Sequence, residues 1–405
     1  MRLAYLAPEF LPTWGGVGVY SAELVRNLCM DDEMEIHVIT PKRGADYDSS
    51  KISRFFDNRV QIHNISNAND GFFYNFSFQL SMLKNFEKLN RKYKFDLVHS
   101  ANLVHMPDIY LKLKKMDIPS LTTVHTTLKS QSHVNGKSRL EKGYCKKIAV
   151  EKLTSLSYPY IKFLEKIYLK KTDNLIAVSE WIKGFIANGN NKKDIRVIHN
   201  GVDSEKFHPK NKKSEEFGFL NDKNKPIIFY CGRLLALKGL KTLIDSMKEI
   251  LKKHDVYFVF AGSGDVKIWQ NMIKINGIRE KNYMFLGYVP YEEIHHLYSK
   301  IDIFVLPSFT ESFPLTLLEA MSSGVPVIAS NVGGIPEIIE NQKDGLLFEA
   351  GDSNHLSKII ISILDDKNLG KRISLNARTK IEENFNSKDM AANTKKFYEK
   401  ILEAT

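Results

Sequence analysis

Short apolar runs alternate with amphipathic stretches along nearly the whole chain. The runs lack clean period-two alternation, which is typical of strands buried on both faces of a parallel sheet. Stretches such as Tyr20–Cys29 and Phe78–Tyr93 lie between them and have helical spacing. This repetition predicts parallel sheets joined by right-handed crossovers. The predicted strands are Leu3–Ala7, Glu35–Thr40, Val60–Ile65, Asp96–Ser100, Ser120–His125 and Asn174–Val178, then Ile227–Gly232, Val256–Gly262, Tyr283–Val289, Asp302–Pro307, Pro326–Ser330 and Leu346–Phe348.

One polar break divides this pattern. Residues Asp203–Lys225 contain Pro209 and a lysine-rich run, which predicts a linker. The 405 residues are enough for two domains that each bury a core. We therefore expect an N-terminal domain over 1–202, a second domain over 203–380 and a terminal helix over 381–405. Two doubly wound sheets would bind ligands outside the carboxyl ends of their strands, in the crevice between the domains.

Charge and composition narrow the class of protein. The formal net charge of +11 comes almost entirely from residues 1–200, which hold 30 Lys/Arg against 20 Asp/Glu, whereas residues 201–405 hold 28 against 27. Nucleic acid, an anionic membrane surface, an anionic substrate or an ordinary solvated face would each account for this excess. No interleaved aromatic and basic motif supports nucleic acid, so we expect none as a partner. Scattered cysteines and the lack of a signal peptide or membrane span predict a cytoplasmic protein.

Three segments carry candidate chemistry, and each follows a predicted strand. Gly15 and Gly16 open the first helix, where bare backbone and a helix N-terminus suit an anion, although a tight strand–helix turn needs the same glycines. Arg233 and Lys238 flank the turn after Ile227–Gly232 and suit a diphosphate, or are ordinary surface cations.

The third segment contains two carboxylates, Glu311 and Glu319. If Leu315–Ser323 is a helix, Glu319 lies on an otherwise apolar face and must be hydrogen-bonded, for which ribose hydroxyls are natural donors. Glu311 lies where ligands bind, beyond the strand Asp302–Pro307. Two carboxylates could also form the acid and base of a hydrolase, so their spacing alone does not decide the chemistry.

Together these segments resemble a known family. The Gly-Gly loop, His199–Asp203, the Gly-Arg-x4-Lys-Gly turn and the Glu-x7-Glu element with its trailing Ala-Met-x-x-Gly-x-Pro-Val occur in this order between Pro8 and about Gly351. They resemble glycosyltransferase family 4, the retaining group 1 glycosyltransferases of GT-B fold, whose two Rossmann-like domains face a central cleft. In that family the N-terminal domain receives the acceptor and the C-terminal domain binds a nucleotide-sugar. The resemblance also implies that the terminal helix 381–405 packs back on the N-terminal domain.

The resemblance implies roles for individual residues. Arg233 and Lys238 would clamp the donor phosphates, Glu319 would hold the ribose, and Glu311 with the Ser312 and Phe313 amides would hold the transferred sugar. The nucleobase would lie near Tyr288 and Val289. His125 matches a histidine that contacts the donor sugar, although by itself it is only a histidine at a strand end. The implied catalytic set is His125, Arg233, Lys238 and Glu311, and the implied donor-binding set adds Gly15, Gly16, Asn200, Tyr288, Val289, Ser312, Phe313 and Glu319.

The implied reaction moves a hexose or N-acetylhexosamine from an NDP-sugar to a hydroxyl of a glycan, a lipid-linked or a small-molecule acceptor. A UDP-sugar is favoured as the donor over GDP-mannose. A nucleotide-sugar 2-epimerase of the same fold is the alternative. With two cations on the phosphates we expect no metal and no cofactor, and we interpret Asp46-Tyr47-Asp48 as an ordinary loop.

Two features of the N-terminal half extend this picture toward the acceptor. Basic stretches at Lys112–Lys115 and Lys146–Lys171, the second with several aromatics, favour peripheral attachment to the inner face of the plasma membrane. The polar stretch Thr126–Gly143 is either a lid on the acceptor side or simply a long loop.

Overall fold

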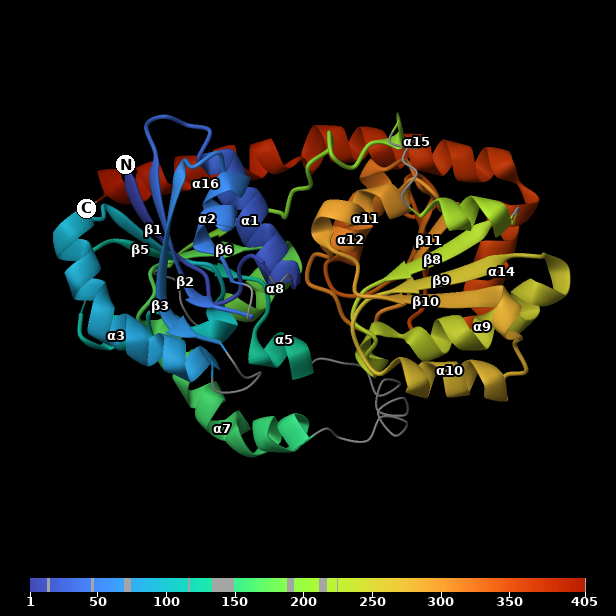
Figure 1. The fold of residues 1–405 in the computed structure, drawn as a ribbon, viewed down its shortest axis with the longest axis horizontal. Coiled ribbons are helices and arrows are strands. Elements are labelled where there is room, and N and C mark those ends of the chain that lie inside the picture. Colours follow the sequence, from blue (N-terminus) through green and yellow to red (C-terminus); the bar gives the residue numbers. More distant parts are fainter. Residues whose placement is uncertain are drawn as a thin grey trace. The chain divides into compact units, whose positions relative to one another are not determined.

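The chain forms two compact units in a computed structural model that describes residues 1–12, 15–44, 47–68, 74–115, 117–132, 149–187, 193–210, 217–223 and 225–404. The described residues of 1–132, 149–201 and 387–404 make up unit 1. Unit 2 is formed by the described part of 202–386. Each unit contains one parallel sheet with helices on it (Figure 1).

Unit 1 is built on a seven-stranded sheet with the order β3-β2-β1-β4-β5-β6-β7. Six predicted runs form β1 to β6, which confirms their assignment. The seventh strand was missed, because all four of its residues are only half-buried and two of them are charged. The strands are β1 Arg2–Leu6, β2 Glu35–Lys42, β3 Val60–Asn67, β4 Leu97–Ser100, β5 Ser120–Val124, β6 Asn174–Ala177 and β7 Asp194–Val197.

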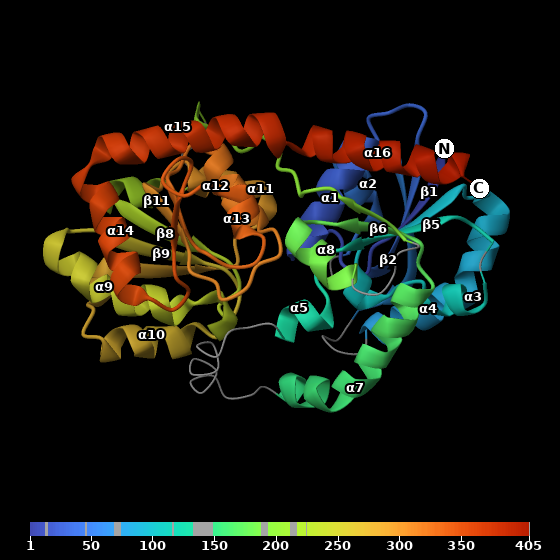
Figure 2. The ribbon, with the colours of Figure 1, turned by 180° about the vertical axis from the view of Figure 1, so that it is seen from behind.

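The helices of unit 1 connect these strands, and one comes from the far end of the chain. Helix α16 packs against α1, and Tyr398 Oη lies 2.6 Å from His99 Nδ1 in the core (Figures 1 and 2). The C-terminal helix therefore belongs to unit 1. The helices are α1 Gly16–Leu28, α2 Ser49–Phe55, α3 Tyr74–Tyr93, η1 Leu103–His105, α4 Ile109–Leu113, α5 Leu128–Ser132, α7 Ala149–Lys170, α8 Glu180–Ile186 and α16 Ser387–Glu403.

Unit 2 is built on a six-stranded sheet with the order β10-β9-β8-β11-β12-β13. All six predicted runs form strands. The strands are β8 Ile227–Cys231, β9 Tyr257–Ala261, β10 Tyr283–Gly287, β11 Ile303–Leu306, β12 Val327–Ser330 and β13 Leu346–Phe348. The helices are η3 Gly218–Lys223, η4 Ala236–Lys238, α9 Leu240–Lys253, α10 Val266–Ile275, η5 Glu280–Asn282, α11 Tyr291–Tyr298, α12 Leu315–Ser322, α13 Ile335–Ile338, α14 Ser353–Asp365 and α15 Lys367–Asn384.

The two faces of this second sheet bury different side chains, because successive residues of a strand point to opposite faces. Ile228 and Tyr230 belong to the core cluster formed with α9, α10 and α14. Phe229 faces the other way and lies 5.5 Å from the ring of Tyr298 in α11. Burial on both faces explains why the strands are continuous apolar runs in the sequence.

Two stretches differ from what their polarity predicted. The predicted linker Asp203–Lys225 begins inside unit 2, because Val202 N donates to Phe385 O at 2.9 Å and Phe207 is fully buried. Unit 2 also continues past residue 380, since α15 ends only at Asn384. The predicted loop 126–143 starts with the short helix α5, and its residues 133–143 lie outside the described part.

In the part of the chain that is described, no helix is long and apolar enough to cross a membrane.

Candidate active site

Lys238 and Glu311 form the centre of a polar cluster in unit 2. Lys238 Nζ lies 2.6 Å from Glu311 Oε1, and the Ser308 hydroxyl donates to the same oxygen at 2.7 Å. The two side chains come from the loops after β8 and β11, which are neighbouring strands. Phe309 N donates to Leu237 O at 3.0 Å, so the backbones of the two loops are also joined. Strand pairing therefore brings together a lysine and a glutamate that the sequence separates by 73 residues.

Two glycines allow this close approach of loops. Gly239 has φ 68°, and a Cβ atom there would lie 1.8 Å from Pro307 O. Gly333 has φ 59°, and its Cβ would lie 1.9 Å from Glu311 O, an oxygen that accepts a hydrogen bond from Gly334 N at 3.0 Å. Both conformations are costly for any other residue. The backbone of Glu311 is thus held by a Gly-Gly turn after β12.

Glu319 lies on α12 and is 5% exposed. The Tyr298 hydroxyl donates to Glu319 Oε2 at 3.0 Å, which supplies the hydrogen bond that a buried carboxylate needs. Burial, together with the negative charge of Glu319, raises the pKa of the Cys231 thiol. The predicted helix Leu315–Ser323 is confirmed as Leu315–Ser322.

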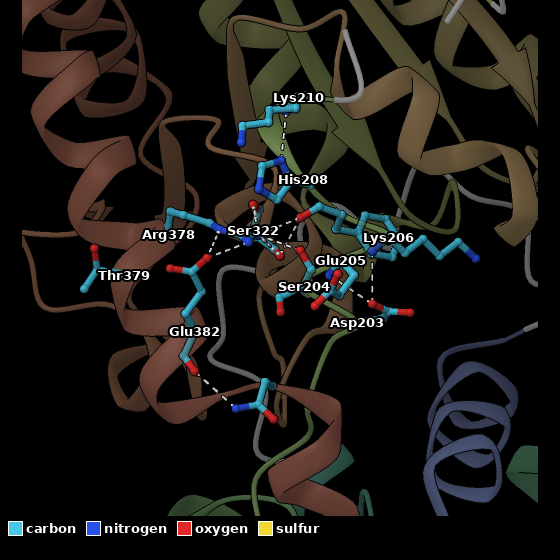
Figure 3. Close-up of polar contacts among 12 residues, drawn as sticks. Asp203, Ser204, Glu205, Lys206, His208, Lys210, Ser322, Arg378, Thr379 and Glu382 are labelled. Atoms are coloured by element: carbon cyan, nitrogen blue, oxygen red, sulfur yellow. Dashed lines mark hydrogen bonds and ion pairs between the residues drawn. The ribbon is translucent and has the colours of Figure 1, made fainter. Parts of the chain in front are cut away.

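Arg378 holds the end of the helix that carries Glu319. Its Nη1 donates to Ser322 O at 2.6 Å and to Phe207 O at 2.8 Å, while its Nη2 lies 2.6 Å from Glu382 (Figure 3). Ser322 is the last residue of α12, where carbonyls lack partners within the helix. The guanidinium satisfies these carbonyls and connects α15, α12 and the segment that follows residue 202.

The other candidates in unit 2 are more exposed. The Arg233 guanidinium is exposed and forms no ion pair with a residue that the structure describes. Tyr288 is 50% exposed beyond β10, and Val289 and Ser312 are half-buried. The Phe313 side chain is buried with its ring 5.5 Å from Phe385, so only its backbone can contribute to a site.

Unit 1 holds the remaining candidates. His125 follows β5 and is 9% exposed, with its ring 4.4 Å from the ring of Tyr20. Its Nε2 has no hydrogen-bond partner among the described residues. Burial, reinforced by nearby His105, lowers the pKa of His125 to about 3, against a hydrogen bond with the Ala101 backbone that raises it. His125 is therefore neutral at physiological pH, and its Nε2 can accept a hydrogen bond from a ligand.

Gly15 and Gly16 stand at the start of α1. Gly15 is the N-cap with extended backbone, and Val19 N donates to its carbonyl at 3.0 Å. A Cβ atom at Gly16 would meet nothing within 4 Å. Thr13 and Trp14 precede them outside the described residues. Asn200 is buried in the segment that follows β7. As the N-cap, Gly15 provides no side-chain cap to α1.

Tyr47 and Asp48, from the triplet that we interpreted as an ordinary loop, precede helix α2. Asp46 lies outside the described residues. Asp48 caps α2, because its carboxylate accepts from Ser50 N at 2.9 Å and from Ser50 Oγ at 2.7 Å. Within the described residues, no three His, Cys, Asp or Glu side chains are grouped so as to hold a metal ion.

Comparison with known proteins decides the family. Residues 14–206 match the family described as Glycosyltransferase Family 4, and residues 211–380 match Glycosyl transferases group 1. The capsular polysaccharide biosynthesis glycosyltransferase CapM of Staphylococcus aureus is 30% identical over 63% of this chain and 69% of its own length. The chain is a family 4, group 1 glycosyltransferase.

Further relatives fit this glycosyltransferase along almost its whole length. The UDP-Gal:alpha-D-GlcNAc-diphosphoundecaprenol alpha-1,3-galactosyltransferase of Escherichia coli is 28% identical over 93% of this chain and 92% of its own. HepE of Anabaena, solved with UDP and glucose, superposes with a TM-score of 0.75 at 19% identity and covers 98% of both chains. The predicted GT-B class, with two Rossmann-like parallel-sheet domains, is confirmed.

Several groups in this glycosyltransferase were not found by the sequence analysis. Tyr298 donates a hydrogen bond to Glu319, and the Gly333–Gly334 turn contacts the backbone of Glu311. Arg378 donates to the last carbonyl of α12. In unit 1, Glu9 and Arg43 lie near His105, which in turn lies near His125. The tandem glycine after the predicted strand Pro326–Ser330 could have indicated the Gly333–Gly334 turn. Tyr298, Arg378, Glu9 and Arg43 lie in no local motif, so no signal in the sequence marks them.

Proposed function

We propose that this glycosyltransferase moves a hexose or N-acetylhexosamine from a UDP-sugar to a hydroxyl of a glycan, lipid-linked or small-molecule acceptor, with retention of configuration. GDP-mannose is the next donor to test. The observation that carries the proposal is the Lys238–Glu311 pair on the same sheet edge as buried Glu319. The UDP and glucose bound by HepE and the UDP-galactose named for the E. coli relative support a uridine donor.

Each unit would contact the donor through its own residues. In unit 2, Arg233 and Lys238 bind the diphosphate, Glu319 binds the ribose hydroxyls, and the nucleobase lies beside Tyr288 and Val289. Glu311 and the Ser312 and Phe313 amides hold the sugar. In unit 1, Gly15 and Gly16 present backbone to the phosphates, Asn200 adds a polar contact, and neutral His125 accepts a hydrogen bond from a sugar hydroxyl through Nε2.

The reaction follows from where charge develops. The bond between the anomeric carbon and the diphosphate oxygen breaks, and the acceptor oxygen bonds to the anomeric carbon on the same face. The acceptor proton passes to the departing phosphate oxygen. Lys238 and Arg233 stabilise the negative charge that appears on the diphosphate, so the reaction proceeds without a metal or cofactor. Lys238 is already held by Glu311, which positions its ammonium before the donor arrives.

The proposed location is the cytoplasm, with attachment to the inner face of the plasma membrane. Helix α7 supports this: Tyr160 and Phe163 are 59% and 60% exposed beside exposed Lys162 and Lys166. Lys112 has to be removed from the predicted basic surface, because it is buried between Asp108 at 3.2 Å and the Ser120 hydroxyl at 2.7 Å. Flotation with phosphatidylglycerol vesicles at low salt tests the attachment, and Phe163→Ser should weaken it.

The proposed donor chemistry is tested by thermal shift with a panel of UDP- and GDP-sugars in EDTA. One donor should raise the melting temperature of the wild type by mass action. Glu319→Ala should lose that response, and Glu249→Ala, at an exposed glutamate of the same unit, should keep it. A requirement for a divalent cation would contradict the metal-independent reaction. Equal responses of Glu319→Ala and wild type would remove Glu319 from the site.

A further inference from the structure

Unit 1 contains a second polar cluster that the proposed donor contacts do not use. It is formed by Glu9, Arg43, Tyr74 and His105. Glu9 follows β1, Arg43 follows β2 and His105 lies beyond β4, so three neighbouring strands deliver these residues to the carboxyl edge of the sheet. This is the edge at which parallel α/β sheets bind ligands. His125 and Gly15 lie at the same edge, and a Cβ atom at Gly15 would be 3.4 Å from Glu9 Oε2.

Glu9 lies beside a chain of hydrogen bonds that links Asn102, His105 and Tyr74. Asn102 Nδ2 lies 3.5 Å from His105 Nδ1, and His105 Nε2 lies 3.0 Å from the Tyr74 hydroxyl. Glu9 Oε1 is 3.6 Å from the same His105 Nε2. Burial lowers the pKa of His105, which favours the neutral ring, and its Nε2 faces both Tyr74 and Glu9. The Glu9 side chain remains 28% exposed, so a ligand hydroxyl can reach it.

Arg43 has unused donor capacity. Its guanidinium carbon lies 4.5 Å from the centre of the Tyr74 ring. Its Nη2 is buried and has no hydrogen-bond partner among the described residues, and with those residues Arg43 forms no ion pair. A buried guanidinium nitrogen without an acceptor is costly, whereas a bidentate carboxylate or phosphate satisfies it well. The contact with the Tyr74 ring restrains the guanidinium and lowers the entropy lost on binding.

We propose that Arg43 binds an acidic group, carboxylate or phosphate, of the acceptor, while Glu9 receives a hydrogen bond from a hydroxyl of the same molecule. The inference rests on the proposed transferase function and narrows its acceptor to hydroxylated molecules with an anionic group. Arg43 determines acceptor specificity and takes no part in donor binding. A neutral acceptor leaves Nη2 unpaired and binds more weakly.

The test uses pairs of probes that differ only in charge, with the full-length protein saturated with UDP. Methyl β-glucuronide is compared with methyl β-glucoside, and glucose 6-phosphate with glucose. Each probe is titrated, and its affinity is obtained from the rise in melting temperature with probe concentration. We expect the acidic member of at least one pair to bind wild type at least tenfold more tightly than its neutral partner. The glucuronide pair and the phosphate pair separate the two anionic sources.

Variants then assign the preference to Arg43. Arg43→Gln should abolish it, and Arg43→Lys should keep part of it, because the charge remains but the fork is lost. Arg91→Gln, at an arginine whose side chain is 79% exposed, should behave as wild type. Equal binding of acidic and neutral probes by wild type, or a preference that survives Arg43→Gln, overturns the inference. If either result appears while UDP still raises the melting temperature, the acceptor inference fails and the proposed donor binding stands. If UDP itself does not raise the melting temperature of the wild type, the proposed function is contradicted.

Discussion

The candidate site residues of the two units differ in whether their buried polar atoms have partners. In unit 2, Lys238 is paired with Glu311, and Glu319 accepts from Tyr298, so the cluster is closed by its own side chains. In unit 1, His125 Nε2 and Arg43 Nη2 are buried without a partner among the described residues. Buried polar atoms are normally hydrogen-bonded. The difference fits our proposals that unit 2 holds charge in place before the donor binds and that a ligand completes the cluster in unit 1.

The largest effect should come from opening the closed cluster. Lys238→Ala removes the ammonium that we propose binds the diphosphate, and it leaves the Glu311 carboxylate, 10% exposed, without its ion-pair partner. We expect kcat/KM to fall about 10²–10³-fold, the usual cost of losing a group that stabilises transition-state charge. UDP release under initial-rate conditions measures this. Lys252→Ala, at a lysine in an exposed pair with Glu249, is the control, and a loss below about fivefold would show that Lys238 does not stabilise the leaving group.

A backbone change should test the same cluster with a slightly smaller effect. Gly333→Ala places a Cβ atom 1.9 Å from Glu311 O in a left-handed conformation. We expect about 2–3 kcal/mol less stability from strain and displacement of that loop, together with lower activity. Gly277→Ala is the matched control, because Gly277 has φ 73° but nothing within 4 Å of its Cβ position. Equal losses in the two variants, measured by urea unfolding, would mean that contact with Glu311 is unimportant.

The buried, unpartnered His125 of unit 1 should make stability depend on pH. The pKa of His125 is lowered from 6.5 to about 3, so folding favours the neutral ring. The stability it contributes is present above pH 6.5 and is lost as pH falls toward 3, at about 1.4 kcal/mol per unit. Between pH 6.5 and 5, His125→Gln should therefore lose about 2 kcal/mol less than wild type. His355→Gln, at an exposed histidine, should follow wild type. Parallel pH profiles of His125→Gln and wild type would contradict the buried neutral ring.

The sequence predicts the strands of this molecule much better than the side-chain contacts of its candidate site. Strands buried on both faces are continuous apolar runs, so twelve of them could be placed, whereas half-buried Asp194–Val197 carries no such signal. Lys238 and Glu311 were identified because each lies in a local motif after a strand. Their direct pairing could not be predicted, because it depends on β8 and β11 being neighbours. Tyr298 reaches Glu319 from another helix, and only tertiary structure reveals that contact.

The smallest effect should come from that last contact. Tyr298→Phe keeps the ring, which packs on Phe229, and removes only the hydroxyl that donates to Glu319 Oε2. One net hydrogen bond contributes about 1 kcal/mol, so KM for the donor should rise about fivefold. The rate constant kcat should change little, because a ribose contact is the same in the ground state and the transition state. Tyr257→Phe, which removes a hydroxyl bonded to Tyr283 O at 3.2 Å in the same unit, should leave KM unchanged. A fall in kcat without a rise in KM would place Glu319 at the reacting sugar instead of the ribose. Lys238, Glu311 and Glu319 would then all act on the chemical step.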